Sequence, residues 1–155
     1  MFRFVQKDLE CIYITSTIPA DSIITALKVL EIDLSRIYFI DCIAHILMGT
    51  SRTEENVYYV ESPTMLEDIM LKVEYLIKLT KDSGRGKLVL LDSINSLAIH
   101  NNTKILSEFL HVLVNNLRSK EAYTIILSIM EQSNEEISNL TNFVCDDTII
   151  IEESE

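Results

Sequence analysis

The amino-acid sequence predicts an α/β domain with a mostly parallel central sheet and helices on both faces. Two observations support this fold class. Short runs rich in Ile, Val and Tyr alternate with longer segments of helical periodicity, and several of these runs are apolar at consecutive positions. Strands separated by helices favour parallel β-α-β crossovers, and continuously apolar strands are typical of sheets covered on both sides. The length of 155 residues suits one hydrophobic core, so we expect a single domain over residues 1–155.

Three of the expected strands lie in the first half of the chain. They cover residues 11–15, 37–40 and 57–60. Between the first two, apolar residues at helical spacing follow Pro19, which suits a first helical turn because its missing N–H would be unpaired there. The polar stretch 49–56 predicts a mobile loop before the third strand.

The second half contains the clearest helix. It opens at Ser62-Pro63, its apolar residues recur at i, i+3, i+4 and i+7, and it ends near the glycines 84 and 86. The remaining expected elements are a strand over 87–91, a helix after Asn101-Asn102, a strand over 123–129, a short helix from a capping box at Ser133 and Glu136 to Leu140, and a last strand over 148–151.

Charge and hydropathy exclude several classes of partner. The net charge is −11, and the last 35 residues carry nine acidic residues and no basic one. A duplex-binding surface needs the opposite sign, so we expect no direct nucleic-acid partner. No apolar run approaches the ~20 residues of a bilayer span, and the first residues lack the apolar stretch of a secretory signal. We therefore expect a cytoplasmic protein without a membrane partner, whose three cysteines are reduced.

Polar residues at strand ends are the candidate site residues, because ligands of open parallel sheets bind at the carboxyl ends of the strands. They are Asp41, Asp92 and the pair Glu131-Gln132. Asp92 is the strongest candidate, since an apolar strand ending in Asp-Ser can deliver a carboxylate to magnesium beside a nucleotide phosphate. On spacing alone, the more common role of such an Asp is to cap the turn that follows. A metal held by Asp41, Cys42 and His45 on one helical turn is a less favoured alternative.

Several stretches together carry a family pattern. They are residues 11–16, 34–41, 87–93 with 95–97 downstream, 123–128 and 147–152. In this order they resemble the RecA-type P-loop ATPase core, in the KaiC-like and RadA-like branch common in archaea. The resemblance implies a three-layer sandwich in which Asp92 is the Walker B carboxylate on magnesium and Ser93 follows it. It also implies that Glu131 or Gln132 senses the terminal phosphate.

Two departures from this family argue against catalysis. The family begins with a strand, a G-x-x-x-x-G-K-[ST] loop and a helix, and the sequence contains no such segment; Gly84-Arg-Gly86-Lys87 lacks the spacer and precedes a strand. Residues 15–18 hold no acid where catalytic relatives carry carboxylates. We therefore expect no catalytic residue, no cofactor and no ATPase activity. Asp92, Ser93, Glu131 and Gln132 would then be the remnant of a nucleotide site.

These observations lead to two alternative functions. The favoured one is a non-catalytic RecA/KaiC-like module for protein interaction or regulation. The alternative is a KaiC/RadA-type ATPase that binds ATP and magnesium through a Walker A loop from a partner or from a missing upstream segment. In the family the phosphate-loop strand lies between the strands that match 123–129 and 148–151, so without it the sheet should close up or leave a slot that residues 1–5 or another chain could cover. We therefore expect as partner either a second copy, forming a homo-oligomer, or a RecA/KaiC-like ATPase.

Overall fold

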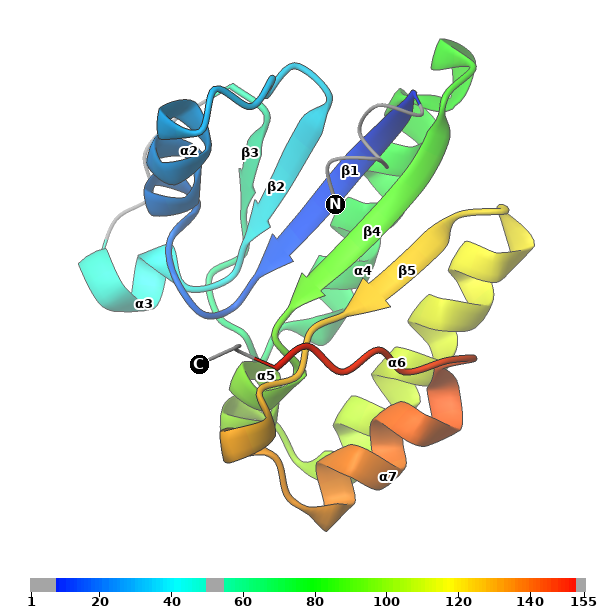
Figure 1. The fold of residues 1–155 in the computed structure, drawn as a ribbon. Helices are drawn as coiled ribbons and strands as arrows, with labels where there is room; N and C mark the ends of the chain where they lie inside the picture. The colour runs from blue at the N-terminus through cyan, green and yellow to red at the C-terminus, as the bar shows by residue number, and fades with distance from the viewer. Residues whose placement is uncertain (1–7, 50–54, 153–155) are drawn as a thin grey trace.

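The computed structural model of the chain describes residues 8–49 and 55–152. Its centre is a five-stranded sheet of order β3-β2-β1-β4-β5, in which every neighbouring pair is parallel (Figure 1). The strands are β1 (Leu9–Thr15), β2 (Ile37–Asp41), β3 (Val57–Tyr59), β4 (Gly86–Asp92) and β5 (Tyr123–Ile126). The α-helices are α2 (Ala20–Val29), α3 (Ala44–Met48), α4 (Leu66–Leu79), α5 (Ile94–His100), α6 (Thr103–Ser119) and α7 (Glu135–Val144), with 3-10 turns η1 (Lys81–Ser83) and η2 (Met130–Gln132).

Helices cover both faces of the sheet, as the fold class predicted. On one face, α4, α5, α6 and α7 bury a large apolar core against the strands, which contribute Ile12, Ile14 and Val89 among others. On the other face, α2 packs over Phe39 and Tyr13 in a smaller cluster. Successive side chains of a strand point to opposite faces, and this alternation separates the two cores. Among the described helices, none combines the length and apolarity that a bilayer crossing needs.

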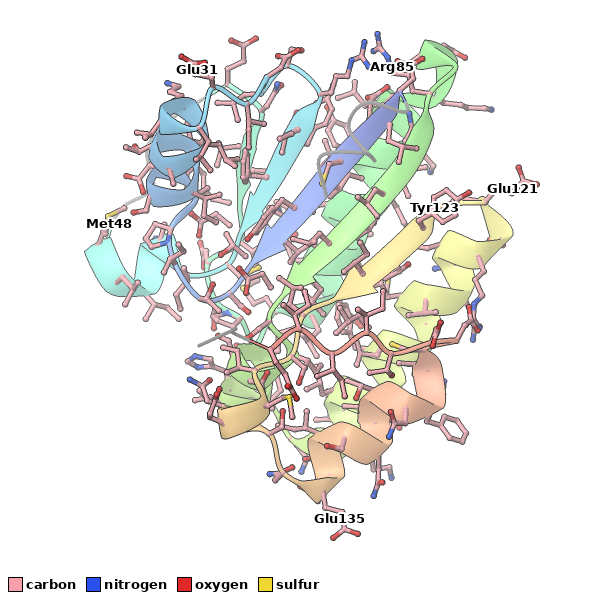
Figure 2. The ribbon with its side chains drawn as sticks, viewed as in Figure 1. Glu31, Met48, Arg85, Glu121, Tyr123 and Glu135 are labelled. Atoms are coloured by element: carbon pink, nitrogen blue, oxygen red, sulfur yellow. The ribbon has the colours of Figure 1, made fainter. Side chains whose placement is uncertain are left out.

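Because the strands are parallel, all their carboxyl ends lie at one edge of the sheet and all their amino ends at the other. Arg85, which precedes β4, marks the amino edge in Figure 2, near the tails of the strand arrows of Figure 1. At this edge the ammonium of Lys87 lies 3.2 Å from Oε1 of Glu10 and donates to the carbonyl of Thr80 at 2.9 Å. Lys87, which follows the two glycines, therefore forms a buried ion pair with Glu10 at the amino edge.

The expected strands and helices are mostly confirmed, with shifted ends. Two short helices that the sequence analysis did not predict, α3 and α5, follow directly on β2 and β4. The helix predicted from Ser62-Pro63 begins three residues later, at Leu66, and Pro19 precedes α2 as its N-cap. The predicted mobile loop 49–56 and the predicted role of residues 1–5 fall largely on residues outside the described ranges.

Three expectations near the carboxyl terminus are wrong. The strand predicted over 123–129 ends at Ile126: after it, the Leu127 carbonyl accepts the Ile94 N–H at 3.0 Å, and η2 begins at Met130. The N-cap of α7 is Asn134 and not Ser133: the side-chain oxygen of Asn134 accepts the Ile137 N–H at 2.9 Å. Residues 148–151 form no strand despite their β-branched sequence: in the described chain they pair with none of the five strands of the sheet.

Candidate functional site at the carboxyl edge of the sheet

The candidate site is built by the adjacent ends of β2, β1 and β4. The register places Thr15 of β1 opposite Asp41 of β2 on one side and opposite Asp92 of β4 on the other. The two strand-end carboxylates therefore flank the same residue of the central strand. The short connections after these strands lead directly into helices, which begin at the same edge.

Asp92 is half-buried, and its contacts join β4 to β1. The Tyr13 hydroxyl donates to Oδ2 of Asp92 at 2.8 Å. The Asp92 carbonyl accepts the Ser16 N–H at 2.8 Å and the Ser16 hydroxyl at 3.2 Å. Within residues 8–49 and 55–152, Oδ1 of Asp92 has no hydrogen bond. One carboxylate oxygen at this strand end thus stays available for a ligand.

Ser93 is fully buried and its hydroxyl caps α5. Oγ of Ser93 accepts the Ser96 N–H at 3.2 Å, and the Ser93 carbonyl accepts the Ser16 hydroxyl at 3.4 Å. The peptide bond between Asp92 and Ser93 is cis. The side chain of this predicted site residue is therefore used to satisfy the helix amino terminus, as N-cap serines do.

Asp41 uses both carboxylate oxygens for backbone N–H groups. Oδ1 accepts the N–H groups of Ile43 and Ala44 at 2.9 Å each, and Oδ2 accepts the Ala20 N–H at 2.7 Å. The side chain is 1% exposed. Asp41 thus fixes the starts of α2 and α3 at the end of β2, which is the capping role that its position at a strand end suggested.

Glu131 and Gln132 lie on η2, and both side chains are exposed. No hydrogen bond or ion pair connects either side chain to the rest of the described chain. The structure therefore places them in the connection after β5, at the same edge as Asp92, and no hydrogen bond or ion pair among the described residues joins them to it.

Asn95 positions this connection, although sequence reasoning assigned it no role. Its Oδ1 accepts the Ile129 N–H at 2.7 Å, and its Nδ2 donates to the Ser133 hydroxyl at 3.0 Å. Asn95 is 3% exposed, so these bonds satisfy a buried amide. The sequence feature that could have identified this role is the position of Asn95, a polar residue between the apolar Ile94 and Leu97 and three residues after Asp92.

Tyr13 is the second residue that sequence reasoning missed. Its ring packs against Phe39, with centroids 5.6 Å apart, while its hydroxyl reaches Asp92. Burial raises the pKa of the Tyr13 phenol, and the hydrogen bond to Asp92 adds to this effect. Tyr13 is therefore a neutral hydrogen-bond donor throughout the physiological pH range. Only the strand register, which aligns β1 with β4, identifies this pair.

The alternative of a metal on Asp41, Cys42 and His45 finds little support in the contacts. Both oxygens of Asp41 already accept backbone hydrogen bonds. Cys42 is buried, and its burial, followed by the nearby Asp41 charge, raises the pKa of its thiol. In the described ranges, no group of three or more His, Cys, Asp or Glu side chains is arranged to hold a metal ion.

Electrostatics at the carboxyl edge are acidic. The connections that leave the five strand ends are residues 16–19, 42–43, 60–65, 93 and 127–134, and none of them contains Lys or Arg. The strand ends and connections do contain Asp41, Glu61, Asp92 and Glu131. Two hollows on the molecule, of about 460 and 420 Å³, are lined by other residues, between α2 and β2 and between α6 and α7.

The parallel sheet, its two helical layers and an acidic strand end followed by Ser define an α/β domain of the RecA type. A family model described as "ATPase: KaiC" matches residues 2–155. The match covers nearly the whole chain, so the chain belongs to the KaiC ATPase family, as the resemblance implied. Comparison with curated proteins gave no match.

Proposed function

We propose that the chain acts as a non-catalytic KaiC-family domain, a module for protein interaction or regulation. The observation that carries this proposal is the charge of the carboxyl edge. The connections after the five strands contain acidic residues and no Lys or Arg. Magnesium-bound ATP keeps a net negative charge, so a site that binds it needs cationic or N–H donors around the phosphates.

The positions of the glycines support the same proposal. Phosphate loops use glycines between a strand and a helix, where N–H groups can surround an oxyanion. Gly49 ends α3 in the left-handed region at φ 70°, and Gly84 follows η1 at φ 73°. Gly86 begins β4 at the amino edge. None of these three glycines connects the carboxyl end of a strand to a helix.

The carboxylates also argue against hydrolysis by this chain alone. Phosphoryl transfer depends on positioning and charge stabilisation, including a group that orients the attacking water. Asp41 accepts three backbone hydrogen bonds, so it is not free for this task. The connection after β1 contains no acid.

A second candidate function is a nucleotide site completed by a Walker A loop from a partner or from another segment. The observation that favours it is Oδ1 of Asp92, which has no partner among the described residues at a strand end. In that case Asp92 would hold magnesium, and Ser93, Glu131 and Gln132 would lie on the nucleotide side. ATP and magnesium are ligands of this chain only under this candidate.

Titration calorimetry with magnesium-ATP tests the proposal directly. We expect no binding heat and no phosphate release by the purified chain. A matched pair of variants gives the test its specificity: Asp92→Asn changes the candidate ligand, and Glu61→Gln changes another carboxylate in a connection at the same edge. Binding or hydrolysis that is lost in Asp92→Asn but kept in Glu61→Gln would overturn the proposal.

A reconstitution experiment separates the two candidates. The chain is mixed with a KaiC-family ATPase that has its own Walker A loop, and phosphate release is compared for wild type and Asp92→Asn. Under the module proposal, any change in the partner's rate is the same with both forms. Stimulation that requires Asp92 would instead support a nucleotide site completed by the partner.

A further inference from the structure

Among the described residues, the sheet ends at β5, and the outer edge of this strand is unpaired. β5 pairs with β4 from Tyr123 to Ile126, and no strand in the described ranges pairs with its other side. Just after the strand, the Leu127 N–H donates to the Leu91 carbonyl at 2.9 Å. Backbone groups of alternate residues in a parallel strand face opposite sides, so those of Thr124 and Ile126 face outward. They form an open hydrogen-bonding edge.

The outer edge of β5 is also partly apolar. Tyr123, at the start of the strand, is 62% exposed, and Figure 2 shows it at the rim of the molecule beside Glu121. Leu127 and Met130, which follow the strand, are 39% and 65% exposed. Natural edge strands are usually protected by lysines, prolines or bulges. The β5 sequence, Tyr-Thr-Ile-Ile, has neither Lys nor Pro.

A second unpaired element lies after α7. Residues 148–151, Thr-Ile-Ile-Ile, have the composition of a strand but adopt no regular structure, and Ile149, Ile150 and Ile151 are 86%, 62% and 89% exposed. We call residues 148–151 the tail. In the view of Figure 1, the tail, in red, runs below β5. Three consecutive isoleucines exposed to this extent form an apolar surface that no other part of the described residues covers.

We propose that the tail of a second copy of this chain pairs with the open edge of β5, and that the first copy returns its own tail in the same way. This inference rests on the proposed role as an interaction module, and it names the surface and the partner. Within residues 8–49 and 55–152, one chain contains both a sheet edge that pairs with no strand and a β-branched segment that pairs with no sheet. In a reciprocal exchange, the open edge of β5 in each copy pairs with the tail of the other copy. Two-fold contacts of this kind are the commonest in homo-oligomers.

The position of the chain's own tail favours a second copy over pairing within one chain. The segment that leads into the tail is held against α6, because Arg118 donates to the Val144 carbonyl at 3.2 Å and to Oδ1 of Asp146 at 2.6 Å. In this position the three isoleucines are exposed and do not pair with β5. A tail from another copy is not tied to this helix.

Charge predicts how salt affects this association. Each copy has a net charge of −11, and the residues around the tail include Asp146, Asp147 and Glu152. Two such surfaces repel each other, and salt screens the repulsion between exposed charges. Exchange between copies should therefore strengthen as the salt concentration rises. Pairing with a basic partner would weaken under the same change.

Sedimentation equilibrium of the full chain tests the exchange, at about 50 mM and about 500 mM NaCl, which change the screening length severalfold. We expect a monomer–dimer equilibrium that shifts toward dimer at the higher concentration. Thr124→Pro removes an outward N–H without removing a bond to β4, and Ile150→Lys places a charge in the tail. Each should weaken dimerisation at least about tenfold.

A matched control shows whether the effect belongs to this surface. Leu71 on α4 is 62% exposed, the same fraction as Ile150, and it lies on a helix away from β5. Leu71→Lys should leave the dimer unchanged. If Thr124→Pro lowers the folded fraction in a urea titration, Ile150→Lys alone decides the test. Amide hydrogen exchange adds a direct readout, since the Thr124 and Ile126 amides should become protected as dimer forms.

The outcomes separate this inference from the proposed function. A chain that remains monomeric at both salt concentrations overturns the exchange, as does a dimer that both variants leave intact or that higher salt dissociates. None of these results would restore ATP binding, so the module proposal would stand. ATP hydrolysis that requires Asp92 would overturn the module proposal, whatever the oligomeric state.

Discussion

The phenol of Tyr13 on β1 donates a 2.8 Å hydrogen bond to the carboxylate of Asp92 at the end of β4. The bond joins two neighbouring strands at the carboxyl edge and uses one of the two Asp92 oxygens. A metal ion bound at Asp92 would therefore have Oδ1 as its ligand unless Tyr13 moved away. Tyr13 is thus the residue that decides how much of this carboxylate a ligand can reach.

Removal of this phenol should destabilise the fold by a modest amount. Tyr13→Phe takes the hydrogen bond from Asp92 Oδ2 without changing the ring that packs on Phe39. Hydrogen bonds to charged groups contribute roughly 1.5–3 kcal/mol to stability. Because this one is half-exposed, we expect Tyr13→Phe to lower the unfolding free energy by about 1.5 kcal/mol, as measured by urea denaturation. Tyr75→Phe is the control, since Tyr75 is 52% exposed, and a surface change should cost less than about 0.5 kcal/mol. Equal losses in both variants would contradict this role.

The two strand-end aspartates should differ in their effect on stability. Asp41→Ala leaves three backbone N–H groups without their acceptor, whereas Asp92→Ala removes one side-chain hydrogen bond. Since a buried donor without a partner costs roughly 1–3 kcal/mol, we expect Asp41→Ala to lower the unfolding free energy by at least about 3 kcal/mol. The loss in Asp92→Ala should be less than half as large. Chemical denaturation of both variants compares them, and a larger effect of Asp92→Ala would refute the capping role of Asp41.

The buried pair Lys87–Glu10 at the amino edge should behave as a coupled unit. The side chains lie 3.2 Å apart, and the residues are 9% and 3% exposed. Lys87→Met leaves Glu10 buried with only Arg85 Nη1 at 3.9 Å, so we expect a loss of about 3–5 kcal/mol. The double variant Lys87→Met with Glu10→Leu should recover part of the lost stability, because neither side chain of the pair then leaves a buried charge. A double-mutant cycle from urea titrations measures the coupling, and additive losses would disprove it.

Alkaline pH should destabilise the protein through Cys11. Burial raises the pKa of this thiol from 9.0 to about 12, so the folded state keeps a proton that the unfolded state loses. Stability is therefore fully present below about pH 9 and falls as the pH rises toward 12, by at most about 1.4 kcal/mol per pH unit from this group. Tyr13 and Cys42, whose pKa values are also raised, act in the same direction.

The variant Cys11→Val isolates the contribution of this thiol. Urea midpoints in reducing buffer, measured for both proteins between about pH 8 and about pH 10.5, should decline less steeply in the variant. Identical slopes would show that Cys11 does not cause the decline.

Sequence patterns predicted the strands with their apolar periodicity but not the details of the site. The buried runs around Ile40 and Leu91 were recognised because a strand covered on both faces is apolar at every position. The short helices α3 and α5 were missed, since five and seven residues show too little periodicity. Residues 148–151 were expected to form a strand because local propensity favours it, but they pair with no strand among the residues that the structure describes.

The sequence by itself determined the α/β class and the acid at the end of the strand that begins at Gly86, because hydrophobic periodicity and residue order are properties of the chain. The KaiC family was suggested by resemblance, and the family match confirmed it. Only the tertiary structure decided which carboxylate is free. Asp41 and Asp92 look alike in sequence, since each follows an apolar strand. Strand register and the starts of α2 and α3 bring three N–H groups to Asp41, and only the phenol of Tyr13 to Asp92. Hydrogen bonds between distant segments depend on how the strands align in space, and local sequence does not encode that alignment.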